Sequence, residues 1–366
     1  MKMTRTILTA LSLFLLALQL FLPTNARSAA ATDDWATLVA AAKQEGKLVI
    51  IGPVGPDRRD SLTVPFQQKY GISIEYIPDP VTIIATRIST ERQAGKYLCD
   101  AVIAGALEDA LLPLNILEPM EQFLLLPEVK NLKNWRGGAL EFLDPGRTIL
   151  IMTAFQRGTL FANTQLADPK VFKSYKDLLD PKWTGKIATD DPRKSGPGQA
   201  TFEFFYFHPE LGEKFVRALA NQKLTLFKDY AQEVDSLGRG KFPLAVGLSD
   251  SLVEQRAAQG VPLAIVDPRQ LREGSDVSPA SGGLGVFNRA PHPNAAKLYV
   301  NWLLSKEGQT SFARGTGYIS NRVDVPTDHA APWRVPKPGA IKTYGLQARH
   351  DLRVKLMPLL FEVFGR

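Results

Sequence analysis

A short charged and glycine-rich stretch has the residue types of an anion-binding loop. Residues 180–199 read as a turn, a short strand, a loop carrying Asp190, Arg193, Gly196 and Gly198, and the start of an aromatic-rich helix. The first N–H groups of a helix lack partners and favour negative charge, and an arginine fork can hold a carboxylate or phosphate. The pattern predicts a cradle for a small anion. The alternative is a tight turn whose Arg193 forms a surface pair with Asp190.

Other candidate ligand-binding residues follow three further predicted strands. In a parallel sheet covered by helices, ligands gather at the carboxyl ends of the strands. The residues at those ends are Gly52, Gly55, Arg58, Arg59, Gly105, Ser249 and Asp250. We expect them to border the same site as the loop within 180–199. For each arginine taken alone, a solvated helix face is the alternative, because arginine is mostly exposed in proteins.

Common enzyme motifs are absent from the sequence. It contains no H-E-x-x-H, no G-x-S-x-G, no phosphate-binding P-loop and no C-x-x-C. The four histidines fall in separate segments, and no nucleophile stands beside a base. Asp190 and Asp191 could serve as acid and base, but Arg193 and Lys194 beside them would hold both carboxyls ionised. We therefore expect no catalytic residues, no metal ligands and no cofactor.

The first thirty residues have the pattern of a secretory signal peptide. Lys2 and Arg5 precede a largely apolar run at 7–22, and small residues at 26–31 offer a cleavage region. A membrane anchor would need about 20 apolar residues without such a region. We therefore predict that residues 1–30 are removed and that the mature chain is exported.

The positive charge of the chain is mild and scattered. The formal net charge of +7 falls to about +4 when residues 1–30 are removed, because three basic residues and no acidic ones are lost. A nucleic-acid partner would require lysine and arginine clustered on one face, so none is expected. The lone cysteine, Cys99, cannot form an internal disulfide, and stability must come from apolar cores.

Short apolar runs alternate with helical patterns along the chain, which indicates an α/β fold. Strands are predicted at 47–52, 71–77, 100–105, 186–189, 223–227, 244–248 and 261–266. Helices are predicted at 35–45, from 57, and at 82–93, 172–179, 198–207, 211–220, 251–260, 294–305 and 340–364. About 335 mature residues exceed the usual size of a single core, so we expect two lobes.

Seven motifs, in chain order, resemble the extracellular solute-binding proteins of ABC importers, in the branch related to ferric-ion-binding periplasmic proteins. Among them are ERQAGKY at 91–97, DLLDPKWTGKI at 177–187, APHPNAAK at 290–297 and NWLLSKEGQ at 301–309. The others lie at 34–49, 191–193 and 196–198. Together they cover nearly the whole mature chain.

The resemblance implies a type II periplasmic-binding-protein fold. Each lobe would be a mostly parallel sheet flanked by helices, and two crossover strands, near 149–158 and 282–288, would join the lobes. The first lobe would comprise 33–150 and 284–325, and the second 151–283 and 326–366. Such a protein would be a monomer that catalyses nothing, closes by hinge motion on a small ligand, and delivers it to an ABC permease in the inner membrane.

One departure from the ferric branch bears on the ligand. Proteins of that branch that hold ferric ion use two adjacent tyrosines after the strand equivalent to 244–247. Here residues 248–252 read Leu-Ser-Asp-Ser-Leu. The resemblance therefore favours a small organic or phosphorus-containing anion over bare ferric ion. Iron held with a synergistic anion, and an exported hydrolase on the same scaffold, are the alternatives.

Overall fold

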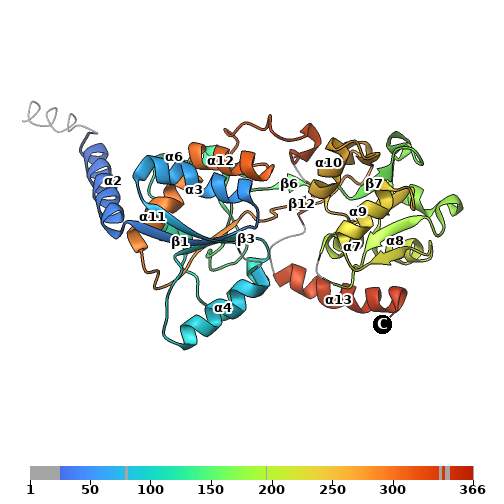
Figure 1. The fold of residues 1–366 in the computed structure, drawn as a ribbon, viewed down its shortest axis with the longest axis horizontal. Coiled ribbons are helices and arrows are strands. Elements are labelled where there is room, and N and C mark those ends of the chain that lie inside the picture. Colours follow the sequence, from blue (N-terminus) through green and yellow to red (C-terminus); the bar gives the residue numbers. More distant parts are fainter. Residues whose placement is uncertain (1–24, 79–80, 195, 338–339, 343–346, 366) are drawn as a thin grey trace, which may run out of the picture.

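The chain folds into two lobes, each built around its own sheet. The computed structural model describes residues 25–78, 81–194, 196–337, 340–342 and 347–365, so most of the predicted signal peptide lies outside the described residues. The six-stranded sheet of the first lobe and the five-stranded sheet of the second follow one another along the long axis (Figure 1). A two-stranded ribbon lies between them.

The first lobe has strand order β2-β1-β3-β13-β5-β4. Its strands are β1 (Lys47–Gly52), β2 (Ser73–Pro78), β3 (Ala101–Ala104), β4 (Glu141–Phe142), β5 (Leu150–Ile151) and β13 (Gly283–Val286). Its helices are α2 (Asn25–Glu45), α3 (Pro56–Tyr70), α4 (Val81–Gln93), α5 (Leu107–Ala110), α6 (Pro127–Lys130), α11 (Pro293–Leu304) and α12 (Lys306–Thr316). β1 runs parallel to β2 and β3, whereas β13 is antiparallel to β3 and β5.

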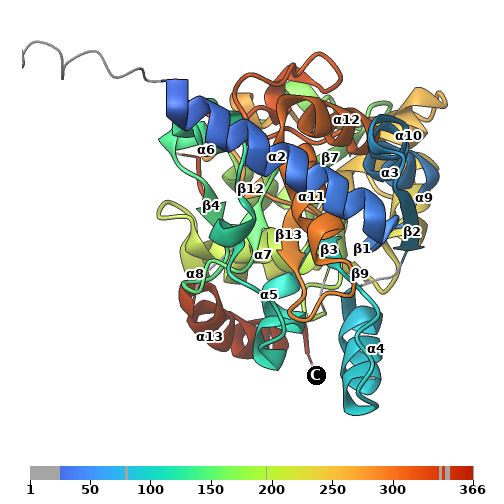
Figure 2. The ribbon, with the colours of Figure 1, turned by 90° about the vertical axis from the view of Figure 1, so that its left-hand side faces the viewer.

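Alternate residues of β1 fill two cores on opposite faces of this sheet. Leu48 and Ile50 belong to one apolar cluster, together with Trp302 of α11, and Val49 and Ile51 belong to another. Burial on both faces explains why the strand reads as a continuous apolar run. Figure 2 shows α2 crossing the outer face of this lobe in front of α11, against which it packs.

The second lobe has strand order β11-β7-β10-β8-β9. Its strands are β7 (Leu160–Asn163), β8 (Ile187–Asp190), β9 (Thr225–Phe227), β10 (Leu244–Val246) and β11 (Leu263–Ile265). Its helices are α7 (Pro197–Phe207), α8 (Gly212–Ala220), α9 (Tyr230–Gly238), α10 (Asp250–Ala258) and the C-terminal α13 (Gln347–Phe364). β8, β9 and β10 are parallel, and β7 is antiparallel to β10 and β11, so both sheets are mixed.

The crossover ribbon consists of β6 (Phe155–Gln156) and β12 (Val277–Ser278), which pair antiparallel. The first crossing falls within the predicted range 149–158. The second falls before the range 282–288 expected from the glycine-rich sequence, because Gly283–Val286 is a strand of the first sheet. The glycines there serve close packing: a Cβ on Gly282 would lie 1.9 Å from Thr153 Oγ1, and one on Gly283 would lie 2.8 Å from the Ala104 carbonyl.

Several short segments depart from the helical expectation. Residues 172–179, predicted as an α-helix, form only the 3-10 turn Tyr175–Leu179, which Ser174 and Asp177 close with a capping box. Other 3-10 turns are Leu112–Leu114, Met120–Phe123, Leu132–Asn134, Arg136–Gly138, Pro169–Val171, Pro181–Trp183, Pro268–Gln270 and Pro332–Arg334. Among the described helices, none combines the length and apolar character that a membrane span needs.

Candidate functional site

The carboxyl end of β8 is enclosed by the loop predicted as an anion cradle. Asp190 is fully buried; one of its carboxylate oxygens accepts the N–H of Gly198 at 3.1 Å and the other pairs with Lys194 Nζ at 2.8 Å. A Cβ on Gly196 would lie 2.6 Å from Asp190 Oδ2, and one on Gly198 only 2.1 Å from the Asp190 carbonyl oxygen. Both glycines are therefore required by the fit of this loop against its own strand.

Arg193 turns away from Asp190 and joins the loop to the C-terminus. Its Nε and Nη2 donate to the two carboxylate oxygens of Asp191 at 2.8 and 2.7 Å. Its Nη1 donates to the carbonyls of Phe364 and Gly365 at 3.1 and 2.6 Å. The hydrogen bonds from Arg193 lower the pKa of the Asp191 carboxyl below its usual value. The arginine fork expected to hold an anion thus has protein partners on both sides.

The end of β10 lies beside the loop that follows β8. Asp250, at the start of α10, connects this region to the crossover segment and to Arg334. A Cβ on Gly247, which follows β10, would lie 2.8 Å from Gly198 Cα. Asp250 Oδ2 accepts the N–H of Gly158 at 3.2 Å and pairs with Arg334 Nη1 at 3.0 Å. Ser249 is the N-cap residue of α10, and its hydroxyl lies 3.2 Å from that of Ser251.

The three candidate glycines of the first lobe stand where the backbone needs them. A Cβ on Gly52 would lie 2.4 Å from Tyr76 Oη, whose hydroxyl donates to the Pro53 carbonyl. Gly55 has a φ of 129° at the start of α3, a conformation that L side chains rarely adopt. A Cβ on Gly105 would lie 2.5 Å from the carbonyl oxygen of Ala280. These glycines shape the strand ends, whatever binds there.

The two candidate arginines of α3 have different surroundings. Arg59 pairs with its neighbour Asp60 at 2.8 Å and is exposed. Arg58 donates weakly to the Val54 carbonyl at 3.4 Å, and its guanidinium carbon lies 5.9 Å from the centre of the Tyr318 ring. Among the described residues, no carboxylate lies within ion-pair distance of Arg58. Arg58 therefore retains donors for a ligand.

An aromatic stack connects Arg58 to the second lobe. The Tyr318 ring lies parallel to that of Phe155 in β6, with centroids 5.0 Å apart and planes 10° apart. The guanidinium carbon of Arg334 lies 5.4 Å from the centre of the Phe155 ring, and Arg334 also pairs with Asp250. The predicted residues Arg58 and Asp250 are thus the two ends of one network through the crossover strand. Tyr318 and Arg334 were missed because their segments have no periodicity.

A second arginine lies at the crossover. Arg157, which directly follows β6, donates through Nε to both oxygens of Asp276 at 3.0 and 2.9 Å. Its Nη2 lies 3.5 Å from Thr201 Oγ1, in the first half of α7. The Asp276 side chain is almost fully buried, and that of Arg157 is 12% exposed. No sequence motif marked this pair, because its members are 119 residues apart and meet only when β6 and β12 pair.

A buried acid lies behind the loop. Glu233 of α9 is fully buried, and neither of its carboxylate oxygens has a hydrogen-bond partner within the described chain. Burial and the nearby charge of Asp190 raise its pKa to about 10, although Lys194 acts in the opposite direction. Glu233 is therefore uncharged at neutral pH. Sequence reasoning missed it because it predicted no helix at 230–238 and because glutamate is usually exposed.

The charges around the second-lobe strand ends are largely compensated within the protein. Lys194, Arg193, Arg157 and Arg334 each have a carboxylate within 3.0 Å. Three or more metal-binding side chains do not gather at any point within the described ranges. The arrangement suits recognition by hydrogen bonds and by the donors of Arg58 better than capture of a highly charged ion by the second lobe.

Comparisons with known proteins agree with this architecture. A family described as bacterial extracellular solute-binding protein matches residues 61–337. An uncharacterized protein of Haemophilus influenzae is 32% identical over 149 residues, which are 40% of this chain and 41% of that relative. The matched part thus spans less than half of the curated relative.

Two solved structures are similar in fold. IdiA (FutA) of Trichodesmium, in complex with iron and citrate, is 19% identical, with a TM-score of 0.65 over 87% of this chain and 100% of that one. AfuA of Actinobacillus pleuropneumoniae, with fructose-6-phosphate bound, is also 19% identical, with a TM-score of 0.60 over 86% and 98%. The predicted two-lobed fold is confirmed, and the chain belongs to the family of bacterial extracellular solute-binding proteins.

Proposed function

We propose that this protein is a periplasmic receptor that binds a small anionic solute between its lobes and delivers it to an ABC permease of the inner membrane. Three observations support the proposal: the family match, the two lobes joined by the β6–β12 ribbon, and the contacts of Gly105 with Ala280 and of Asp250 with Gly158 beside that ribbon. The two similar structures hold a sugar phosphate and iron with citrate, so an anion is part of both ligands. The protein itself would perform no chemistry on the solute.

Arg58 is the residue that carries the anion proposal. It lies in the first turn of α3, where the helix dipole and the free N–H groups also favour negative charge. Tyr318 fixes one face of its guanidinium and leaves the hydrogen-bonding edge without a carboxylate among the described residues. An anion bound there would form charge-assisted hydrogen bonds, which are the strong ones in proteins. Closure of the lobes would then bring the Asp190–Gly198 loop onto the other side of the solute.

The chain offers a matched pair of variants for testing this proposal. A panel of inorganic phosphate, hexose phosphates, citrate and dicarboxylates would be screened by thermal shift against the mature protein. A ligand at 100 times its Kd should add about 2.7 kcal/mol of stability. Arg58→Ala should remove this shift, whereas Arg59→Ala should retain it, because Arg59 is already paired with Asp60.

Three results would contradict the proposal. An equal shift in the Arg58→Ala protein would remove Arg58 from the site. Stabilisation by iron salts alone, with a visible charge-transfer band, would replace the anion with a ferric ligand. Turnover of an ester or phosphate compound in the panel would show an enzyme.

A further inference from the structure

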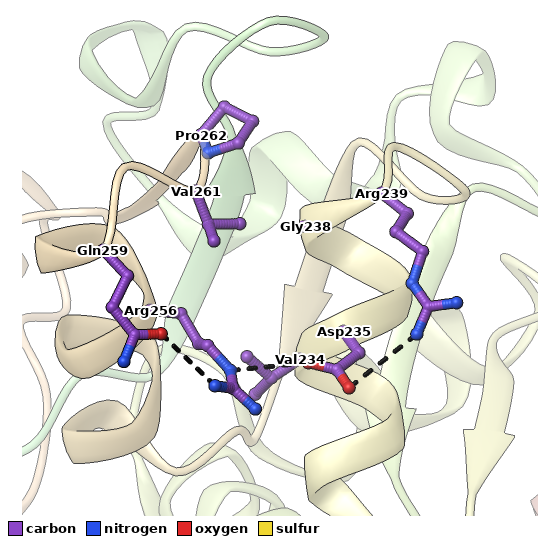
Figure 3. A pocket seen from close by; sticks show the side chains of 8 residues that line it. All are labelled: Val234, Asp235, Gly238, Arg239, Arg256, Gln259, Val261 and Pro262. Carbon is purple, nitrogen blue, oxygen red and sulfur yellow. Dashed lines mark hydrogen bonds and ion pairs between the residues drawn. The ribbon is translucent and has the colours of Figure 1, made fainter.

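A cavity of about 470 Å³ lies in the second lobe, between α9 and α10 (Figure 3). It is lined by Val234, Asp235, Gly238, Arg239, Arg256, Gln259, Val261 and Pro262. Arg256 is in the last turn of α10, six residues beyond the Asp250 of the lobe junction. The cavity is therefore formed by a different part of α10 from the part that borders the proposed solute site.

The polar side of the cavity holds two arginines and a single carboxylate. Figure 3 shows Asp235 between the guanidinium groups of Arg239 and Arg256. The ion-pair distances are 3.8 Å from Arg239 Nη2 and 3.5 Å from Arg256 Nε, and both are longer than ordinary hydrogen bonds. Because one acid serves two arginines, this rim carries a net charge of about +1.

The guanidinium of Arg256 is held on two sides, and its Nε faces only the long ion pair with Asp235. The Nε atom of Arg256 is buried, and no acceptor among the described residues makes a hydrogen bond with it. Its Nη1 donates to Gln259 Oε1 at 3.3 Å, which holds the guanidinium in place. The Arg256 side chain as a whole is 34% exposed, so an anion entering the cavity can reach the outer part of its guanidinium.

The opposite side of the cavity is apolar. Val234 is fully buried, and Val261 and Pro262 are partly exposed. A Cβ on Gly238 would lie 2.7 Å from Val261 Cγ1, so the glycine is what lets the two segments approach. The volume lies within the usual range for small-molecule sites, about 300–1,000 Å³. The cavity thus offers an apolar wall facing a cationic rim.

We propose that this cavity is a second site, which binds a small organic anion with an apolar body and a carboxylate or phosphate head. The head would accept hydrogen bonds from the guanidinium groups of Arg256 and Arg239, and the body would pack on Val234 and Val261. Such a ligand would join α9 to α10. This proposal does not depend on the anion proposed for the lobe junction.

Benzoate is a suitable probe. Acetate carries the carboxylate head without the apolar body, and benzyl alcohol carries the apolar body without the charged head. Binding would be followed by the valine methyl resonances of the mature protein during titration. We expect millimolar benzoate to shift the methyl resonances of Val234 and Val261. Acetate and benzyl alcohol should bind more weakly. Arg256→Gln should weaken benzoate binding at least about tenfold, since a charge-assisted hydrogen bond is lost.

Two controls separate this site from others. Arg272→Gln, an exposed arginine of the same lobe that pairs with Glu210, should leave benzoate affinity unchanged, and so should Arg58→Ala. Arg239→Gln provides a second rim variant if Arg256→Gln lowers the melting temperature. Equal binding of benzyl alcohol and benzoate, unchanged affinity in both rim variants, or no methyl shift at about 20 mM benzoate would each overturn the proposal.

Discussion

At the scale of single residues, the uncharged Glu233 makes a prediction about pH. Its pKa of about 10 in the folded protein exceeds the ordinary value of 4.5, so its contribution to stability is complete below pH 4.5 and is lost as the pH rises towards 10. Glu233→Gln removes this proton linkage. The free energy of unfolding of the variant, relative to the native protein, should therefore increase from pH 5 to pH 8, by at most about 1.4 kcal/mol per pH unit.

Denaturant unfolding at several pH values measures this difference. Glu362→Gln is the matched control, because Glu362 is an exposed glutamate of the same lobe whose pKa is lowered by Arg217. Since Glu362 is ionised in both folded and unfolded chains over this range, that variant should show no such trend. Parallel curves for native protein and Glu233→Gln would mean that Glu233 is charged when folded.

The residue scale also shows what the sequence could and could not predict about the site. The position of Asp190 at a strand end followed from a short apolar run before a charged loop. The ion-pair partner of Asp190 could not be predicted, because two acids stand beside two basic residues and either acid could pair with either base. In the folded protein Asp190 pairs with Lys194, and Asp191 pairs with Arg193. Partners that come from distant segments, such as Arg334 for Asp250, cannot be identified from a local sequence pattern.

At the scale of elements, the C-terminal helix links the lobes. α13 packs on the second lobe through Leu356, Leu359 and Leu360. Its Arg353 pairs with the buried Glu203 of α7 at 2.6 Å and with Asp109 of α5, in the first lobe, at 2.7 Å. Figure 1 shows α13 running from the junction beneath the second lobe. One arginine thus bridges both lobes.

Asp109→Asn should therefore loosen the lobes without unfolding them. An exposed ion pair contributes about 0–1 kcal/mol, so the melting temperature should change little. The distribution of distances between spin labels on Lys133→Cys and Lys214→Cys, one in each lobe, should broaden. Cys99 should not compete for label, because burial raises the pKa of its thiol to about 12.

An exposed ion pair on α12 of the first lobe provides the comparison. Asp328→Asn breaks the exposed pair with Arg314 at 2.9 Å and should leave the distance distribution unchanged. If Asp109→Asn gave the same distribution as this control, Arg353 would not restrain the lobes.

Elements with strong local signals were predicted well, and those stabilised by distant contacts were not. The strand prediction at 47–52 matches β1, since a short apolar run bounded by glycine has few other solutions. α12 was not predicted, because its sequence is polar and glycine-rich; Ser305 caps it, and Phe312 anchors it in the core. The second crossover strand was predicted at 282–288 instead of at β12, because the sequence does not distinguish glycines that permit close packing from glycines of a loop.

At the scale of the whole molecule, the lobes have separate cores and a slender junction. The apolar clusters of the first lobe share no residue with those of the second. The junction includes a ribbon of two paired residues per strand, the Arg353 bridge and the stack through Phe155. Separate cores make independent unfolding units, and multidomain chains often depart from two-state behaviour.

Calorimetry of the ligand-free protein should therefore give a calorimetric enthalpy larger than the van't Hoff enthalpy. Phe155→Ala removes the ring between Tyr318 and Arg334, outside the four clusters, and should lower the ratio of van't Hoff to calorimetric enthalpy further. Phe227→Ala, which breaks a ring contact with Phe242 inside the second lobe, should instead lower the melting of that lobe alone. A single two-state transition in the native protein and in Phe155→Ala would show that the junction couples the unfolding of the two lobes as tightly as one core does.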